Sequence, residues 1–450
     1  MNNVKGKRWI WMLAILLVLA MSMACGPVNS GEKIGNGTAE GNLKEADSKG
    51  PEIEEGEEKI SGSEVTEATK TPSETEDAAS GSETKASEEK DGSEEAQAPG
   101  EKELQEMRDI TSLELVKEIK IGWNLGNTMD ATGGTGINSE LSWGNPMTKK
   151  EMVDTLKAAG FNVLRVPTTW EKHLGPAPDY KIDEKWLSRV RDIIDYGIDN
   201  DMFVILNMHH EEWHFPSYEN EEAAIKILTA VWKQIANCFE GYDEHLIFEG
   251  LNEPRQKGTP NEWNGGNKEG WDVVNQFNAA FIETIRNAGG NNPLRHLMIP
   301  PYAAAASTKT WSGFTIPEDD KVIVSIHAYT PYNFTLNLNG TSEWSREKPN
   351  DKNEIDGLMS SLDKFFISKG IPVIIGEFGA MNKENIEART DWAEYYIKKA
   401  GEIGIPCIWW DNGAFSGEGE LFGLLDRRNL SWKYPEIVDA LMKGAAESGR

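Results

Sequence analysis

The chain has 450 residues and a formal net charge of −28 at pH 7, because 74 Asp and Glu outnumber 46 Lys and Arg. An acidic chain without a basic cluster is a poor candidate for binding nucleic acid, whose phosphates require clustered Lys and Arg. It has three cysteines, Cys25, Cys238 and Cys407. Cys238 and Cys407 lie in apolar segments and read as core residues, so we expect no disulfide framework.

The first 25 residues have the layout of a bacterial export signal. Basic residues precede an apolar stretch over 9–21, which is too short to be read first as a membrane span. Cys25 follows a small residue and resembles the lipobox cysteine of bacterial lipoproteins, which becomes the acylated N-terminus. We therefore expect an exported protein, lipid-anchored to the cell envelope through Cys25. Ser22 stands where lipoboxes usually carry Leu, so plain cleavage with secretion and an uncleaved anchor stay alternatives.

Residues 26–105 form a segment rich in Ser, Glu and Gly. Positions 26–100 contain no Phe, Trp or Tyr and carry 20 Asp and Glu against 7 Lys. Such a segment cannot bury enough apolar surface to offset the entropy lost on ordering. We expect a disordered acidic linker that repels itself and holds the following domain away from the cell envelope.

Residues 106–450 alternate short β-rich runs with amphipathic helical stretches, which is typical of an α/β domain. Strands that alternate with helices pair in parallel, and eight such units close a (β/α)8 TIM barrel. A doubly wound open sheet alternates too, but it needs a Gly-rich turn after its first strand, and 122–126 is too sparse in glycine. The predicted strands are 119–124, 162–167, 203–209, 246–252, 296–300, 322–327, 372–377 and 407–410. The predicted helices are 151–159, 186–198, 223–239, 274–288, 355–368, 392–403 and 435–445.

Polar or aromatic residues follow the apolar body of most predicted strands. In a parallel barrel the carboxyl ends of all strands meet at one rim, so residues far apart in the sequence converge there. We therefore expect the functional site at this rim. The residues at these strand ends are Trp123, Asn124, Arg165, His209, His210, Asn252, Glu253, His327, Tyr329, Glu377, Trp410 and Asp411.

Two of these strand ends carry a glutamate. Residues 246–254 read LIFEGLNEP, so Glu253 follows an apolar strand and precedes a proline that stops it. Residues 372–379 read PVIIGEFG, where glycines flank Glu377 and leave room for a substrate. Taken singly, the first could be an ordinary turn and the second a solvated strand end. Their joint placement favours glycosidic cleavage, which needs one group to protonate the leaving oxygen and another to attack the anomeric carbon or activate water.

These two motifs resemble glycoside hydrolase family 5, the cellulase family of the four/seven barrel clan. The similarity covers essentially all of residues 106–445 and is closest to the branch with clostridial endoglucanases and xyloglucanases. Further matching segments are 122–128 (GWNLGNT), 164–167 (LRVP), 207–210 (NMHH), 326–329 (IHAY) and 408–412 (IWWDN).

The resemblance implies roles for individual residues. Glu253 would be the acid/base and Glu377 the nucleophile of a reaction that retains configuration, and Arg165 would hold Glu377 ionised by charge pairing. Asn252 would bind the sugar 2-hydroxyl, and Tyr329 would hydrogen bond near Glu377. The other candidates for substrate binding or support are His209, His210, His327, Asn124, Trp123 and, as the platform under the sugar at the cut bond, Trp410.

The run HHEEWH over 209–214 could supply imidazole ligands to a metal. No carboxylate stands at a familiar zinc spacing, and the family's site works without metal, so we expect neither a metal nor another cofactor. Trp143, Trp213, Trp263 and Trp271 fall in predicted loops or strand ends, where they suit sugar stacking as well as core packing.

The resemblance implies an endo-β-1,4-glucanase, or cellulase, that acts as a monomer on β-glucan of the plant cell wall by a two-glutamate double displacement. Xyloglucan, mixed-linkage glucan, xylan and mannan are alternative substrates, because substrate choice depends on loop shape. A noncatalytic polysaccharide-binding protein at the cell surface is an alternative of another class. The presence of both Glu253 and Glu377 favours the enzyme.

Overall fold

The computed structural model describes residues 104–449. The predicted export signal, the acylation at Cys25 and all but the end of the predicted acidic linker lie outside the described residues. Within the described part, no helix is both long and apolar enough to cross a membrane.

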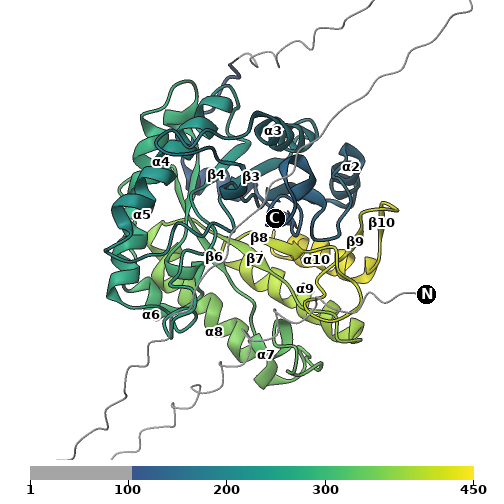
Figure 1. Cartoon of the computed structure of the whole chain (residues 1–450). Coiled ribbons are helices and arrows are strands. Elements are labelled where there is room, and N and C mark those ends of the chain that lie inside the picture. Colours follow the sequence, from purple (N-terminus) through teal and green to yellow (C-terminus); the bar gives the residue numbers. More distant parts are fainter. Residues whose placement is uncertain (1–103, 450) are drawn as a thin grey trace, which may run out of the picture. The chain divides into compact units, whose positions relative to one another are not determined.

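Eight strands form a closed parallel barrel in which each strand pairs with the next along the chain and β8 pairs with β1 (Figure 1). This confirms the predicted TIM barrel. Four strands end earlier than predicted, the second and fifth by one residue, the third by two and the fourth by three, so that His209 and Asn252 lie in the loops that leave the barrel. The strands are β1 (Ile121–Leu125), β2 (Val163–Val166), β3 (Phe203–Asn207), β4 (Leu246–Glu249), β5 (Leu297–Ile299), β6 (Val322–His327), β7 (Val373–Phe378) and β8 (Cys407–Asp411).

Helices surround the barrel (Figure 1). α5, α8 and α9 each begin six residues earlier than the sequence predicted. Asn267 caps α5 by accepting a hydrogen bond from the Gly270 N–H, and Pro349 starts α8 at a position that needs no N–H donor. The longer helices are α2 (Lys150–Ala159), α3 (Glu184–Ile198), α4 (Glu221–Cys238), α5 (Lys268–Arg286), α8 (Pro349–Phe365), α9 (Ile386–Glu402) and α10 (Pro435–Glu447).

The sequence did not predict the short elements, which lie in the connections. Most are single turns whose backbone hydrogen bonds are local, so they leave no hydrophobic periodicity to recognise. They are η1 (Gly136–Leu141), η2 (Glu171–His173), η3 (Asn292–Leu294), η4 (Tyr302–Ala304), α6 (Thr308–Trp311), α7 (Tyr332–Thr335), η5 (Ile367–Lys369) and the hairpin of β9 (Leu425–Asp426) with β10 (Ser431–Trp432).

Side chains on the strands alternate between the barrel interior and the layer under the helices. On β2, Val163 packs in the interior cluster, whereas Leu164 packs in the outer cluster with the helices. The next inward residue is Arg165, which is fully buried. The interior is therefore apolar toward the amino ends of the strands and polar toward their carboxyl ends. The rim at the carboxyl ends is called the mouth below.

Helix α1 (Ser112–Glu118) closes the barrel at the end opposite the mouth. Thr111 and Glu114 form a capping box that starts the helix. Leu115 and Val116 pack against the interior cluster of strand residues. Ser112 bonds through its N–H to the carbonyl of Asp320, which lies just before β6. The described chain thus enters the barrel at the amino ends of its strands.

Candidate active site

Arg165 on β2 is the centre of a polar network beneath the mouth. Its Nε donates to Glu249 Oε2 at 2.7 Å, and its Nη1 donates to Glu377 Oε1 at 2.8 Å. Nη1 also donates to Asn124 Oδ1 at 2.9 Å, and Nη2 donates to Asn252 Oδ1 at 2.8 Å. The guanidinium is fully buried, so these partners must compensate for the water it has lost. The side chain of Arg165 thereby joins β1, β4, β7 and the loop after β4.

Glu249 on β4 is a site residue that the sequence analysis missed. It is fully buried, and its oxygens accept from Ser325 Oγ at 2.5 Å and Asn207 Nδ2 at 3.1 Å, besides Arg165. The sequence did contain a signal for this residue. Side chains alternate along β4, with Ile247 facing the barrel interior and Phe248 facing the helices, so Glu249 must face the interior again. A charged residue at an inward position of an apolar strand needs a buried partner.

Glu377 on β7 has donors on both carboxylate oxygens. Arg165 holds Oε1, and the Tyr329 hydroxyl donates to Oε2 at 3.0 Å. The Nδ1 atom of His327 lies 3.6 Å from Oε2. Only 5 % of Glu377 is exposed, so it opens onto the mouth through a small area. The predicted neighbours Arg165, Tyr329 and His327 therefore do surround this carboxylate.

Glu253 lies in the loop after β4, and its carboxyl group approaches the same Nδ1 atom of His327 as Glu377 does. Its Oε1 lies 2.8 Å from His327 Nδ1. Its Oε2 lies 3.4 Å from Nη1 of Arg255, a residue that the sequence analysis did not select. The side chain of Glu253 is 18 % exposed, more than the 7 % of Glu377. Glu253 is thus the more accessible of the two carboxylates.

The two carboxylates lie close together. One oxygen of Glu253, one of Glu377 and a ring nitrogen of His327 all lie within 4.8 Å of one another. Carboxyl groups about 5–5.5 Å apart suit direct attack on an anomeric carbon, whereas a separation of about 6.5–9.5 Å leaves room for a water molecule. The nearest oxygens of Glu253 and Glu377, within 4.8 Å of each other, thus face one another across a short gap.

The pKa values of these groups depend on one another. Burial raises the pKa of Glu377, and this outweighs the opposing charges of His327 and Arg165. For Glu253, burial is outweighed by the hydrogen bond and charge of His327 and by the charge of Arg255, so its pKa falls to about 2. Burial lowers the pKa of His327, but Glu377 and Glu253 raise it on balance. The charge and hydrogen bond of Arg165 lower the pKa of Glu377, in the direction expected from sequence, while burial acts against them.

His209 and Trp410 form one wall of the mouth. Their rings are parallel, with an interplanar angle of 2° and centroids 5.8 Å apart. His209 Nδ1 lies 3.2 Å from Asn207 Nδ2, and burial lowers the pKa of His209 well below its usual value. His210 is half-buried and packs against Trp143, with ring centroids 5.6 Å apart. These rings offer an aromatic surface beside the carboxylates.

Asn124 and Trp123 were predicted to contact or support a substrate, and the structure places both away from the mouth surface. Asn124 is fully buried and supports Arg165 from below. Trp123 is 1 % exposed and donates from Nε1 to Asp411 Oδ2 at 3.0 Å. It points outward because it alternates with the inward Gly122 and Asn124. Trp123 therefore has no face for a sugar.

The loop tryptophans divide by exposure. Trp263 and Trp143 are 54 % and 41 % exposed, so each offers an indole face to solvent. Trp213 and Trp271 are half-buried and use their N–H groups inside the protein, the first toward Glu211 Oε2 and the second toward the Gly265 carbonyl. The two exposed rings are the better candidates for stacking on a sugar.

Within residues 104–449, potential metal-ligand atoms come within 4.8 Å of one another in two groups. One is the carboxylate pair with His327, where the guanidinium of Arg165 opposes a cation. The other joins Asp130 to His209 and His210, with Asp130 Oδ2 3.9 Å from His210 Nε2. The oxygens of Asp130 already accept two backbone N–H groups. The surroundings of neither group favour a bound cation.

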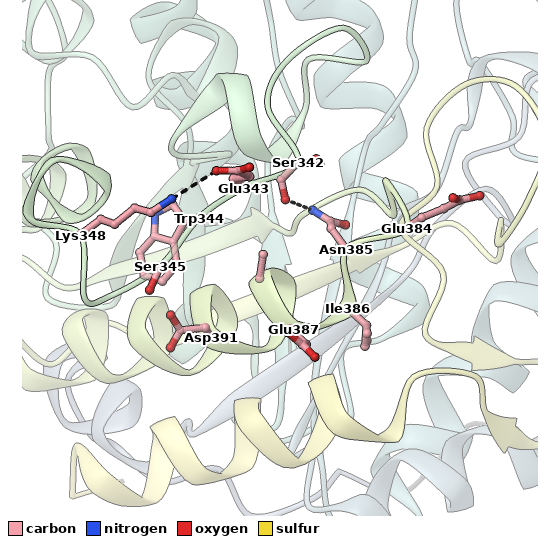
Figure 2. A pocket seen from close by; sticks show the side chains of 11 residues that line it. Ser342, Glu343, Trp344, Ser345, Lys348, Glu384, Asn385, Ile386, Glu387 and Asp391 are labelled. Carbon is pink, nitrogen blue, oxygen red and sulfur yellow. Dashed lines mark hydrogen bonds and ion pairs between the residues drawn. The ribbon is translucent and has the colours of Figure 1, made fainter.

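A cavity of about 620 Å³ lies between residues 342–348 and the start of α9, and none of the predicted site residues lines it. Figure 2 shows Lys348 paired with Glu343 at this cavity and Asn385 bonded to the backbone of Ser342. Trp344 is the one aromatic residue in its lining and is only 5 % exposed. The cavity therefore lacks the open aromatic face on which sugars stack.

A parallel (β/α)8 barrel that holds two facing carboxyl groups at the carboxyl ends of its strands has the site of a glycoside hydrolase. The chain belongs to glycosyl hydrolase family 5, the cellulase family, whose model matches residues 126–416. This range contains β2 to β8 and both Glu253 and Glu377.

Three relatives show how far the similarity extends. Endoglucanase B of Neocallimastix patriciarum is 54 % identical over 350 residues, which cover 76 % of this chain and 73 % of the relative. The structure of a broad specificity endoglucanase from Ruminococcus champanellensis with bound cellotriose is 50 % identical, covers 75 % of this chain and 100 % of its own, and has a TM-score of 0.74. The structure of a xyloglucan-specific endo-β-1,4-glucanase from a metagenomic library, in complex with cellotriose, is 44 % identical in sequence. The match covers 73 % of this chain and 97 % of that one, with a TM-score of 0.71.

Proposed function

We propose that this protein is an endo-β-1,4-glucanase that hydrolyses internal bonds of β-glucan with retention of configuration. The observation that carries the proposal is the carboxylate pair at the mouth, with oxygens of Glu253 and Glu377 within 4.8 Å of each other. The names of the relatives support the activity, and two of the solved structures hold cellotriose.

In the first step a carboxylate oxygen of Glu377 attacks the anomeric carbon, and the bond from that carbon to the leaving oxygen breaks. Glu253 gives a proton to the leaving oxygen. The Nδ1 atom of His327 lies 2.8 Å from Glu253 Oε1, so the imidazole hydrogen bonds to the group that transfers this proton. In the second step Glu253 takes a proton from water, and the water oxygen replaces Glu377 on the anomeric carbon.

The side chains around the two glutamates can stabilise charge and bind the sugar during these two steps. Tyr329 and Arg165 donate to Glu377 and so stabilise its charge when the covalent bond breaks again. Asn252 Oδ1 accepts from Arg165, which leaves its amide N–H groups to donate to a sugar hydroxyl. Trp410, 7 % exposed, offers the edge of an aromatic platform beside His209.

β-1,4-Glucan is the first choice of substrate. Xyloglucan is the second, because a xyloglucan-specific enzyme is 44 % identical to this chain. A panel of purified β-glucans, xyloglucan, xylan and mannan, assayed for reducing ends with one preparation, tests this order. Hydrolysis of none of them, with Glu253→Ala and Glu377→Ala as negative controls, would support a noncatalytic binding protein instead.

The N-terminal segment carries a proposal of its own. We propose that the protein is exported as a monomer and anchored at the cell surface by acylation of Cys25, as the export signal and the cysteine at its end suggest. Labelling cells with a palmitate analogue should mark the wild type and leave Cys25→Ala unlabelled and released. Release of the unlabelled wild type into the medium would favour plain secretion.

A further inference from the structure

Arg255 contacts Glu253, one of the two facing carboxylates, and has no role in the reaction described so far. It lies in the same loop as Glu253, two residues further along the chain. Its Nη1 donates to the backbone carbonyl of Glu253 at 3.0 Å and lies 3.4 Å from Glu253 Oε2. Its side chain is 16 % exposed, so the charge is partly shielded from water.

Two further residues hold the guanidinium of Arg255 in place. Its Nε donates to Glu262 Oε1 at 3.2 Å, and Glu262 Oε2 accepts from the Gly258 N–H at 2.8 Å, which closes the loop. The guanidinium carbon lies 4.1 Å from the ring centroid of Trp263. A guanidinium stacked on an indole is held by a cation–π contact as well as by its hydrogen bonds.

Glu253 lies beyond the end of β4. The backbone bonds of its neighbours Asn252 and Pro254, to Met208 and Ala303, fix the loop but leave the direction of the side-chain carboxyl group to its own contacts. His327 holds one of its oxygens and Arg255 faces the other. Other elements also present charged or titratable groups to Glu253, namely Glu377 from β7, His210 from the loop after β3 and Glu420 from the loop after β8. Of these groups, Arg255 is the permanent cation that contacts Glu253 directly.

We propose that Arg255 is a positioning residue. Clamped by Trp263 and Glu262, it holds the carboxyl group of Glu253 beside the leaving-group oxygen in the first step and beside the attacking water in the second. This inference rests on the proposed function. The clamp acts through Glu253 and makes no contact with Glu377, so it affects proton transfer and leaves nucleophilic attack intact.

The charge of Arg255 gives a second, separable effect. It lowers the pKa of Glu253, so its removal raises that pKa. Glu253 shares its proton with His327, and without the charge of Arg255 that shared proton is held more tightly, so in Arg255→Met the alkaline limb of kcat/KM should move to higher pH. Arg255→Lys keeps the positive charge but loses the planar guanidinium that donates to two acceptors and stacks on Trp263. The alkaline limb of this variant should therefore stay in place, while proton transfer by Glu253 is impaired.

The test compares aryl β-cellobiosides with a good leaving group, 2,4-dinitrophenol, and a poor one, phenol. Arg255→Met should lose about tenfold or more in kcat/KM on the phenyl substrate, which needs the proton, and about twofold at most on the dinitrophenyl substrate. Trp263→Ala should lose about threefold more on the phenyl substrate than on the dinitrophenyl substrate, the size of an exposed cation–π contact, while any lost sugar stacking lowers kcat/KM on both substrates alike.

Arg346→Met is the matched control, because Arg346 also pairs with two carboxylates, Asp391 and Glu394, on another part of the barrel. It should leave both substrates and the pH profile unchanged. Equal losses on both substrates in Arg255→Met and Arg255→Lys, with an unmoved alkaline limb, would overturn the inference and indicate a structural role. If Arg255→Met does not fold, the leaving-group dependence of Arg255→Lys decides. A wild type inactive on every glucan would instead refute the proposed function.

Discussion

His327 hydrogen bonds to Glu253 with Nδ1 2.8 Å from Oε1, and the same nitrogen lies 3.6 Å from Glu377. One imidazole thus contacts both carboxylates of the pair, and its proton is shared with the group that must give a proton to the leaving oxygen. The three groups titrate together rather than one by one.

The pH dependence of kcat/KM should be bell-shaped. Glu377 must be ionised, and its pKa is raised above 4.5, so the acid limb should lie above pH 4.5. The proton shared by His327 and Glu253 is lost as pH rises through the raised pKa of His327, so the alkaline limb should lie above pH 6.5. Initial rates on a soluble β-glucan at low substrate concentration measure both limbs. An acid limb below pH 4.5 would contradict the burial effect on Glu377.

The two glutamates should respond differently to azide. Glu253→Ala should lose most activity on glucan but still form the covalent intermediate from an activated aryl glycoside, and azide should then restore turnover with a β-glycosyl azide as product. Glu377→Ala should be inactive in the first step, and azide that enters the vacated space should give the α product. Product analysis by NMR distinguishes the two. The opposite pattern would reverse the roles of Glu253 and Glu377.

Arg165→Met should destabilise the fold strongly. It leaves Glu249 and Glu377 buried without their cation, a change that costs about 3–5 kcal/mol. Arg346→Met removes a cation from a more exposed pair of carboxylates and should cost about 1 kcal/mol or less. Denaturant unfolding of both variants gives the comparison. Similar costs for the two would mean that the Arg165 network is not what holds the interior.

Trp123→Phe and Trp410→Phe should separate stability from activity. Trp123→Phe removes a buried hydrogen bond to Asp411, so unfolding should become easier by about 1 kcal/mol with kcat/KM unchanged. Trp410→Phe keeps most of the packing but shrinks the aromatic surface beside His209, so kcat/KM should fall by about two- to tenfold. A loss of activity in Trp123→Phe at unchanged stability would restore its predicted role at the substrate.

Deleting residues 26–100 should leave kcat/KM on soluble glucan unchanged, because that segment has no aromatic residue with which to bind a sugar or pack on the barrel. The test compares the purified deletion variant with the full-length protein. A collapse of activity would show that the segment takes part in turnover.

Prediction from sequence worked best where one strong pattern decided the outcome. Alternation of strands and helices defined the barrel, and the rule that strand carboxyl ends meet at one rim brought Arg165, Glu253 and Glu377 together. It failed where the direction of a side chain mattered. Trp123 lies next to Asn124 at the same strand end, yet the two point to opposite sides of the sheet.

The missed residues have physical reasons too. Glu249 was hidden because the run around it is apolar, and only the inward and outward alternation of β4 reveals it as buried. Arg255 lies in an irregular loop, where no periodicity predicts that its guanidinium turns back to Glu253 and stacks on Trp263. Loop geometry depends on tertiary contacts that local sequence does not encode.

Because α1 closes the barrel at the end opposite the mouth, the described chain begins on the side away from the active site, and this determines where a fusion partner or a solid support is best attached. Arg108 pairs with Glu244 just before β4, and Lys321 just before β6 pairs with Asp109, so the described chain begins against the sealed end. A fusion partner, affinity handle or solid support joined upstream of residue 104 is therefore connected on the side away from the carboxylate pair. Immobilisation through that end should leave long polymers free to thread across the mouth, whereas coupling through the loops that follow β4 or β8 would block their path.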